Sequence, residues 1–213
     1  MAAEPQPGTR AERRERASAD TRVRILEAAR ACLLADGYAS LSTRRVAETA
    51  DVPLSQIHYY FGSKQELILA VLAAQNERLL ARQASMYAGN EPLWRQWELA
   101  VEFLEEDLES GYVRILQEMI AAGWSDPILA ASVRDQLRGW FQLLADVARR
   151  EERRVGRLGP FTPEEVAALM GLPFMGAEAA ILLGIPESEV PTRAALRKIG
   201  VVLRDLAPRA TGD

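Results

Sequence analysis

Residues 54–59, Leu-Ser-Gln-Ile-His-Tyr, carry the side chains whose types and spacing suggest the most specific chemistry in this chain. Amide, hydroxyl and imidazole groups hydrogen-bond base edges and phosphates, and leucine can contact a thymine methyl group. On a helix, Ile57, Tyr60 and Phe61 would share one buried face, because they follow an i, i+3, i+4 spacing. The outward side chains would then be those of Leu54, Ser55, Gln56, His58 and Tyr59. This pattern predicts a short helix that fits a DNA major groove.

A second short helix is expected over residues 43–50, followed by a tight turn at Asp51-Val52-Pro53. Val46, Ala47 and Ala50 lie within one turn of each other, so they can share the buried side of that helix. Proline lacks an N–H group and suits the start of a helix, where that donor has no partner. The sequence therefore predicts two short helices, over 43–50 and 54–61, around a turn.

The next helix is expected to begin at Lys64 and to continue to about Met86. Ser63 suits its N-cap, and Glu66 stands where a capping box requires an acid. Helix N-termini attract phosphate, and a lysine there adds positive charge. We expect this helix to link the nucleic-acid-binding head to the rest of the chain.

Residues 20–70 as a whole resemble the DNA-binding domain of the TetR family of transcriptional regulators. The first helix and its glycine stop match at residues 24–29 and 33–38. The later matching residues are Thr43, Val46, Ala47, Ala50, Val52, Ile57, Tyr60, Phe61, Ser63, Lys64, Glu66 and Leu67. The resemblance implies an all-α protein with an N-terminal three-helix helix-turn-helix domain and a C-terminal helical ligand-binding and dimerisation domain.

Two residues depart from the family pattern. Asp51 stands where the family usually has glycine, but aspartate tolerates a left-handed backbone better than most residues do. Its negative charge near DNA counts against binding, although only mildly. His58 stands where tyrosine is frequent, and it can still donate to a phosphate or a base edge.

The resemblance assigns the DNA contacts residue by residue. Thr43, Arg44, Tyr59 and Lys64 are expected to contact phosphates. The residues expected to face base edges are Leu54, Ser55, Gln56 and His58. Gln56 could pair with adenine, and the alternative is a solvated polar side chain. Double-stranded DNA is thus the expected partner.

Composition and charge fit a cytoplasmic protein of one or two domains. The chain has 213 residues, of which 48% are hydrophobic, and its net charge is −4. Residues 1–64 hold ten Lys or Arg and eight Asp or Glu, whereas the remainder holds sixteen and twenty-two. A mildly basic head and an acidic body are compatible with DNA binding if the body faces away from the duplex. We expect no membrane segment or signal peptide, and the single cysteine, Cys32, excludes an intrachain disulfide.

Three segments are expected along the chain. Residues 1–18 would be a disordered, arginine-rich arm, which could reach a minor groove or, as we favour, remain a solvated tail. Residues 19–65 would be the helix-turn-helix domain, with its first helix near 20–36. Residues 66–208 would form the helical ligand-binding and dimerisation domain.

The remaining helices follow from apolar periodicity and capping signals. They are expected from Pro92 to before Gly111, over 112–122, from Asp126-Pro127 to about Arg154, from the capping box at Thr162, and over 191–206. Pro173 should kink or break the helix that follows Thr162. The last two helices have apolar faces, and the resemblance implies that they form a homodimer interface.

A homodimer is also expected on physical grounds. One short recognition helix reaches few base edges, and each good bidentate contact discriminates by about 1–3 kcal/mol. Two heads on a two-fold axis address a palindrome and multiply that discrimination.

The resemblance implies a small-molecule effector held in the helical body. Besides Trp94, its candidate binding residues are Trp97, Phe103, Glu118, Met119, Trp124, Trp140, Phe141 and Phe174. Apolar walls suit a pocket and a core equally well, so each aromatic residue could belong to either. Glu118 could recognise a cationic or hydrogen-bonding ligand, or lie on an exposed helix face.

Enzymes form the rival functional class. The chain has one histidine, His58, no Cys/His cluster and no glycine-rich phosphate loop, so we expect no metal, no cofactor and no catalytic residues. A carboxylate-based enzyme, or a helical protein-interaction module with a vestigial helix-turn-helix, remains the alternative. The favoured function is a ligand-responsive repressor that binds a palindromic operator as a homodimer.

Overall fold

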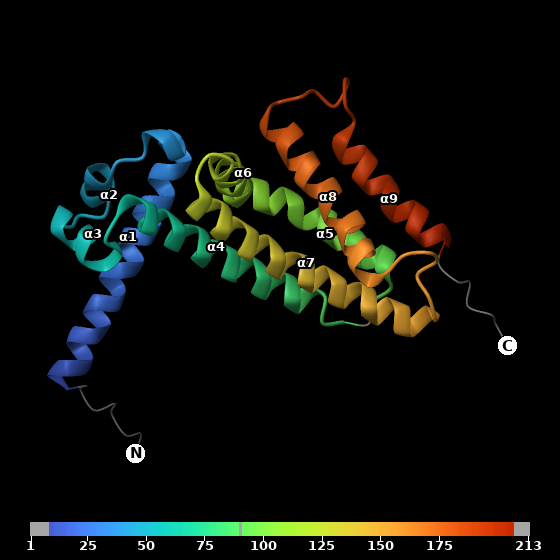
Figure 1. Cartoon of the computed structure of the whole chain (residues 1–213), viewed down its shortest axis with the longest axis horizontal. Coiled ribbons are helices and arrows are strands. Elements are labelled where there is room, and N and C mark those ends of the chain that lie inside the picture. Colours follow the sequence, from blue (N-terminus) through green and yellow to red (C-terminus); the bar gives the residue numbers. More distant parts are fainter. Residues whose placement is uncertain (1–8, 90, 207–213) are drawn as a thin grey trace, which may run out of the picture. The chain divides into compact units, whose positions relative to one another are not determined.

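The computed structural model describes residues 9–89 and 91–206, which form nine α-helices and no strand (Figure 1). The prediction of an all-α fold is confirmed. The helices are α1 (Arg10–Ser40), α2 (Thr43–Thr49), α3 (Leu54–Phe61), α4 (Lys64–Met86), α5 (Leu93–Glu109), α6 (Tyr112–Gly123), α7 (Pro127–Val155), α8 (Pro163–Leu182) and α9 (Thr192–Leu206). The chain divides into two compact units, and the division falls within α4, between Leu72 and Ala73.

The first unit has a small core contributed by α1, α2, α3 and the start of α4. Ile25, Val46, Ile57 and Leu67 are almost fully buried in it. Each occupies the apolar stripe of its helix, and burying a large aliphatic side chain contributes about 1.5–3 kcal/mol. This core holds two helices of only seven and eight residues, which are too short to be stable alone.

Helix α1 begins at Arg10, much earlier than the sequence analysis expected. Residues 10–18, which we predicted to be disordered, form its first turns. The Thr9 hydroxyl accepts a hydrogen bond from the Glu12 N–H, and the Glu12 carboxylate accepts one from the Thr9 N–H. This capping box satisfies two free donors and starts the helix. The predicted arm also includes residues 1–8, which lie outside the described residues. The helical dihedrals are interrupted at Gly37, the expected stop, where φ is 75°.

The second unit is built on long antiparallel and crossing helices. Helix α7 packs against α8 and α6, and α5 packs against α9 (Figure 1). Their shared core consists mainly of large apolar side chains. Its most deeply buried large members are Tyr87, Trp97, Leu104, Leu144, Val147 and Leu196. The Trp97 indole N–H donates to the Leu196 carbonyl at 2.7 Å and so ties α5 to α9.

Helix α8 continues through Pro173, so a break of the helix at this residue, one of the two expected outcomes, is wrong. Proline lacks the N–H that would bond the Leu169 carbonyl, at a cost of about 3 kcal/mol. Buried residues on both sides of it, Met170, Phe174 and Ala177, keep the helix in the core. Tertiary packing therefore overrides the local preference.

One described helix, α8, is long and apolar enough by length and composition to cross a membrane. Core helices of soluble proteins meet the same test. Part of α8 is buried against its neighbours, whereas Leu169, Leu172, Leu182 and Leu183 are exposed. These exposed leucines need a partner or a covering surface.

Candidate nucleic-acid interface and inner cavities

The turn between α2 and α3 has the geometry that the sequence predicts. Asp51 has φ of 51° and is the only non-glycine residue with positive φ in the part of the chain that the structure describes. The Val52 N–H donates to the Ala47 carbonyl at 3.0 Å, and the Ala50 N–H donates to Val46 at 2.9 Å. Aspartate thus takes the left-handed position at the corner, at some steric cost. Pro53 precedes the first residue of α3.

Helix α3 presents one side to solvent and buries the other. Ile57 and Phe61 are buried and Tyr60 is half-buried, as their spacing predicts. Ser55, His58 and Tyr59 are exposed, and Tyr59 is 80% exposed, which is unusual for a large aromatic side chain. Leu54 and Gln56 are half-buried. The Gln56 Oε1 atom is shielded and has no hydrogen-bond partner, so this side chain must rotate before its oxygen can meet a base edge.

Aromatic contacts brace α3 from behind. The ring centroids of Tyr59 and Tyr60 are 5.0 Å apart in an edge-to-face arrangement. The Tyr60 hydroxyl lies 2.9 Å from the Ser18 hydroxyl, and the Arg22 guanidinium lies over the Phe61 ring. Both of these partners belong to α1. These two contacts tie α3 to α1, and the buried side chains of Ile57 and Phe61 anchor the helix in the core of the first unit.

The three other phosphate candidates differ in how freely they reach solvent. Arg44 is exposed and Thr43 is half-buried at the start of α2. Lys64 is half-buried: its Nζ lies 3.5 Å from the Ala39 carbonyl and 5.5 Å from the centre of the Tyr38 ring. Lys64 must therefore swing away from these groups to contact a phosphate.

Of the two hydrogen bonds in the capping box predicted at the start of α4, one is present. The Glu66 N–H donates to the Ser63 hydroxyl at 3.1 Å. The Ser63 N–H donates to the Phe61 carbonyl at 2.8 Å, a bond within the turn, instead of to the Glu66 carboxylate. His58 Nδ1 lies 3.1 Å from the Gly62 carbonyl, to which it can donate as the Nδ1–H tautomer. That bond fixes the imidazole ring beside the exposed surface of α3.

In the second unit, two adjacent cavities lie among α4, α5, α6, α7 and α8. Each has a volume of about 40 Å³, room for only a few water molecules. Gln83, Asp107, Trp140 and Glu178 line both of them. These four side chains therefore stand at the wall between the two hollows.

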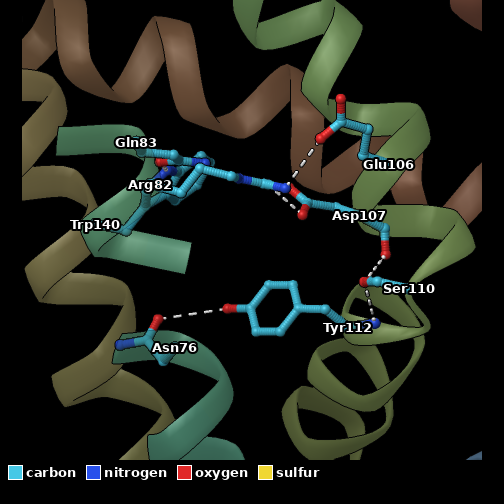
Figure 2. Close-up of polar contacts among 8 residues, drawn as sticks. All are labelled: Asn76, Arg82, Gln83, Glu106, Asp107, Ser110, Tyr112 and Trp140. Atoms are coloured by element: carbon cyan, nitrogen blue, oxygen red, sulfur yellow. Dashed lines mark hydrogen bonds and ion pairs between the residues drawn. The ribbon is translucent and has the colours of Figure 1, made fainter. Parts of the chain in front are cut away.

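Helix α4 is attached to this region by polar contacts (Figure 2). The Tyr112 hydroxyl donates to Asn76 Oδ1 at 3.4 Å, and the Trp140 indole N–H donates to Gln83 Oε1 at 2.9 Å. Arg82 forms an ion pair with Asp107 and contacts Glu106 at 3.3 Å, and Figure 2 shows these groups reaching across from α4 to α5. We call these contacts of Asn76, Arg82 and Gln83 the α4 latch.

The turn between α5 and α6 positions two of the cavity residues. The Ser110 hydroxyl donates to the Asp107 carbonyl at 2.9 Å and accepts from the Tyr112 N–H at 3.2 Å (Figure 2). Gly111 supplies the left-handed conformation, with φ of 78°. Burial raises the pKa of Tyr112, so its hydroxyl stays protonated and can donate to Asn76.

The two cavity carboxylates are held in an environment that disfavours their charge. Burial raises the pKa of Glu178 from its ordinary 4.5 to about 7, although a hydrogen bond from the Gln117 amide at 3.0 Å opposes that change. Burial also raises the pKa of Asp107, against the attraction of Arg82. Carboxylates with raised pKa values in an apolar cavity often mark a functional site.

The eight candidate ligand residues separate into two sets. Trp97, Trp140 and Phe174 line one or both cavities. The other five, which line neither cavity, are Phe103, Glu118, Met119, Trp124 and Phe141. Phe103 lies under the Arg82 guanidinium, Met119 is fully buried, and Trp124 is 82% exposed. Glu118 pairs with Arg114 at 3.1 Å on the outer side of α6.

The polar residues that line these cavities were not predicted from the sequence: Asn76, Gln83, Asp107, Tyr112, Gln136 and Glu178. One signal was available. Glu178 is the only charged residue between Glu165 and Glu187, in an otherwise apolar and small-residue stretch. A lone carboxylate on such a stretch requires a buried partner or a ligand. Nothing comparable in the sequence distinguishes Asp107, which stands in an acidic run.

A larger apolar groove of about 580 Å³ lies beside these cavities in the same unit. It is bounded by α5, the end of α7 with the loop that follows it, α8 and α9, and its walls include Trp94, Phe161 and Leu203. Trp97 and Met170 line both the groove and the second cavity. Among the described residues, no group of three or more His, Cys, Asp or Glu is placed to hold a metal ion.

Comparison with known proteins gives a consistent result. Residues 25–71 match the family described as bacterial regulatory proteins, tetR family. An uncharacterized HTH-type transcriptional regulator in the dhlA 5′ region of Xanthobacter autotrophicus is 28% identical over 173 residues, 78% of this chain and 81% of that protein. The HTH-type transcriptional repressor KstR of Rhodococcus jostii is 38% identical over 79 residues, 37% of each chain.

A solved structure extends the similarity in fold to most of the chain. It is a protein of Saccharomonospora viridis described as a transcriptional regulator in complex with choline. Its TM-score is 0.70 at 18% identity, covering 88% of this chain and 97% of that one. The fold of both units is thus shared with a protein of known structure.

Proposed function

The chain belongs to the TetR family of bacterial regulatory proteins, and from this premise we propose that it is a transcriptional repressor. It binds a palindromic operator as a homodimer and leaves it when a small molecule enters the second unit. The observation that carries the proposal is the exposed face of α3, with Ser55, His58 and Tyr59 at its surface, on a helix whose opposite face is buried. As a DNA-binding protein, it acts in the cytoplasm.

The proposed DNA contacts follow from position and exposure. Ser55 and His58 face base edges, and Leu54 and Gln56 join them after local side-chain rotation. Tyr59 and the α2 residues Thr43 and Arg44 contact phosphates, and Lys64 adds a charge at the start of α4. The first turns of α1 supply four exposed arginines. These are Arg10, Arg13, Arg14 and Arg16.

The exposed apolar residues of α8 and α9 support the homodimer. Leu169, Leu172 and Leu183 follow a helical repeat along the uncovered side of α8, and Val202 is exposed on α9. Covering this stripe with the same stripe of a second copy removes it from water and pairs two reading heads. Two heads then address half-sites separated by about one helical turn of DNA or a multiple of it.

The ligand-responsive element that we propose is the α4 latch. Helix α4 begins in the first unit and carries Asn76, Arg82 and Gln83, whose partners line the cavities or contact their lining residues. A molecule that enters the cavities competes for Asp107 and Trp140 and so changes how α4 is held. This molecule favours release from DNA only if it binds the released arrangement of α4 more tightly than the DNA-bound arrangement, and only by that difference in affinity. The apolar groove beside Trp97 provides its route of entry.

A gel-shift assay with the DNA upstream of the chain's own gene tests the proposal. We expect binding in the nanomolar range, and Ser55→Ala together with Gln56→Ala should abolish sequence preference while leaving the fold intact. Lys64→Ala should weaken all sequences alike and lower the slope of log K against log salt by about one. The matched control is Arg134→Ala, which removes an exposed cation from α7. Equal loss in Arg134→Ala and Lys64→Ala would contradict the assigned interface.

A further inference from the structure

The described lining of the second unit's cavities includes two acids and no basic residue, although Arg82 pairs with one of these acids, Asp107. Asp107 and Glu178 line both hollows, and no Lys, Arg or His is among the described residues that line either one. Their other polar groups belong to neutral residues, such as Asn76 and Gln136. Beside an uncharged or anionic ligand, an ionised Glu178 would stay buried with only the neutral Gln117 amide to stabilise its charge, which is costly.

The two acids differ in how they are neutralised. Asp107 has Arg82, but that guanidinium also contacts Glu106 and lies over the Phe103 ring at 4.5 Å. Glu178 receives a hydrogen bond from the neutral Gln117 amide, and no cation is among its partners in the described part of the chain. The site therefore carries excess negative charge whenever Glu178 is ionised.

The remaining lining suits the body of an organic cation. Trp140 lies between the two hollows, and Trp97 and Phe174 continue the aromatic wall, with ring centroids 5.0 Å apart. Aromatic faces attract alkylammonium groups, and this attraction strengthens where water is excluded. The Gln136 Oε1 atom in the first cavity is buried and has no hydrogen-bond partner. It can accept a hydrogen bond from a donor group on the same ligand.

We propose that these cavities bind a small organic cation, with its ammonium group between Asp107 and Glu178 and its apolar part against Trp140. This deepens the proposed function, because it names the chemical class of the effector. Each hollow as it stands holds only a few water molecules, so the ligand joins them by displacing the shared wall of Gln83 and Trp140. Separating these two breaks one contact of the α4 latch. The cation also replaces Arg82 as a partner of Asp107. This weakens a second contact of the α4 latch.

Binding of a cation should depend on pH through Glu178. The groups that face it are Asp107 from α5, Tyr112 and Gln117 from α6, and Arg82 from α4 by way of Asp107. Burial raises the pKa of Glu178 to about 7, so the ionised form grows from roughly a tenth at pH 6 to nine tenths at pH 8. Affinity for a cation should therefore rise about tenfold over this range.

Calorimetric titration of the purified full chain, without DNA, tests the proposal with three cations: tetramethylammonium, choline and benzyltrimethylammonium. The neutral control is 3,3-dimethyl-1-butanol, which has the shape of choline but no charge. We expect at least one cation to bind, and choline to bind at least tenfold more tightly than the alcohol. Glu178→Gln should weaken cation binding about tenfold at pH 8 and remove its pH dependence.

The matched control is Glu118→Gln, which removes a carboxylate of α6 outside the cavities and should leave cation binding unchanged. Asp107→Asn provides a second variant, and circular dichroism verifies that each one folds. Binding of the alcohol as tight as that of choline, or no binding by any of the three cations, would overturn the proposal. Gel shifts on the same preparations distinguish failure of this inference from failure of the proposed function. Operator binding without cation binding removes only this inference, and cation binding without operator binding removes the proposed function.

Discussion

Replacing Glu178 by glutamine should stabilise the protein, and only above acidic pH. The folded state holds this carboxyl with a pKa of about 7, against an ordinary value of 4.5, because burial disfavours its charge. The raised pKa means that the folded state binds the proton more tightly than the unfolded state does. Stability contributed by the protonated group is therefore complete below pH 4.5 and is lost as the pH rises to 7.

The size of the effect follows from the two pKa values. Each unit of difference corresponds to about 1.4 kcal/mol, so the wild-type chain loses on the order of 3 kcal/mol between pH 4.5 and pH 7. Glutamine is uncharged, has nearly the same shape and avoids that loss. We expect Glu178→Gln to match the wild type near pH 4.5 and to exceed it by about 3 kcal/mol at pH 8, equivalent to roughly 6–12 °C in Tm.

Thermal and urea unfolding of both proteins between pH 4.5 and 8.5 provides the assay, without any ligand. Glu118→Gln serves as the control, because its surface ion pair with Arg114 contributes at most about 1 kcal/mol. A constant difference between Glu178→Gln and the wild type at every pH would refute the reasoning. It would mean that Glu178 titrates in the same way in the folded and unfolded chains, so that the cavity does not bury it.

Three further outcomes follow from local geometry. Gly171→Ala should destabilise the second unit by about 1–3 kcal/mol in urea unfolding, because the added Cβ would lie 2.6 Å from Phe141. The control is Gly139→Ala, whose added Cβ meets only ordinary contacts and should not destabilise the unit. Asp51→Gly should tighten operator binding in gel shifts and raise Tm slightly, since glycine accepts φ of 51° without strain and removes a negative charge near DNA; weaker binding would contradict this. Leu172→Glu should yield monomers in sedimentation and weaken operator binding, and an unchanged dimer would remove α8 from the interface.

The sequence predicted the helix-turn-helix well because its ends are encoded locally. Pro53 and Gly62 set the limits of α3, and the positive φ of Asp51 is a property of one residue. The apolar face of α3 follows from spacing alone. Such short-range signals predict the structure well, because the tertiary contacts stabilise the same conformation that each residue favours locally.

Two features of the helices were predicted less well. Helix α1 begins at Arg10 and not near residue 20, because Thr9 and Glu12 form a capping box directly after the helix-breaking residues Pro5, Pro7 and Gly8. The helix does not break at Pro173, because core packing on both sides of this proline keeps α8 continuous.

The inner cavities could not be derived from periodicity. Asp107 and Glu178 lie far apart in the chain, and only the packing of α5, α7 and α8 brings them to the same hollows. Apolar residues surround Glu118 in the sequence, as they surround Glu178, yet the Glu118 side chain pairs with Arg114. Which carboxylate is buried is decided by the neighbouring helices, and a single helix does not reveal it.

Selection of bound sequences from a random double-stranded pool is the most direct test of the central claim, that the exposed face of α3 reads DNA as part of a two-fold pair. We expect an inverted repeat whose half-site centres are separated by about one helical turn or a multiple of it. Repeating the selection with Gln56→Ala should relax the preference at one symmetric pair of positions. No enriched sequence, or an enriched site without two-fold symmetry, would contradict the account.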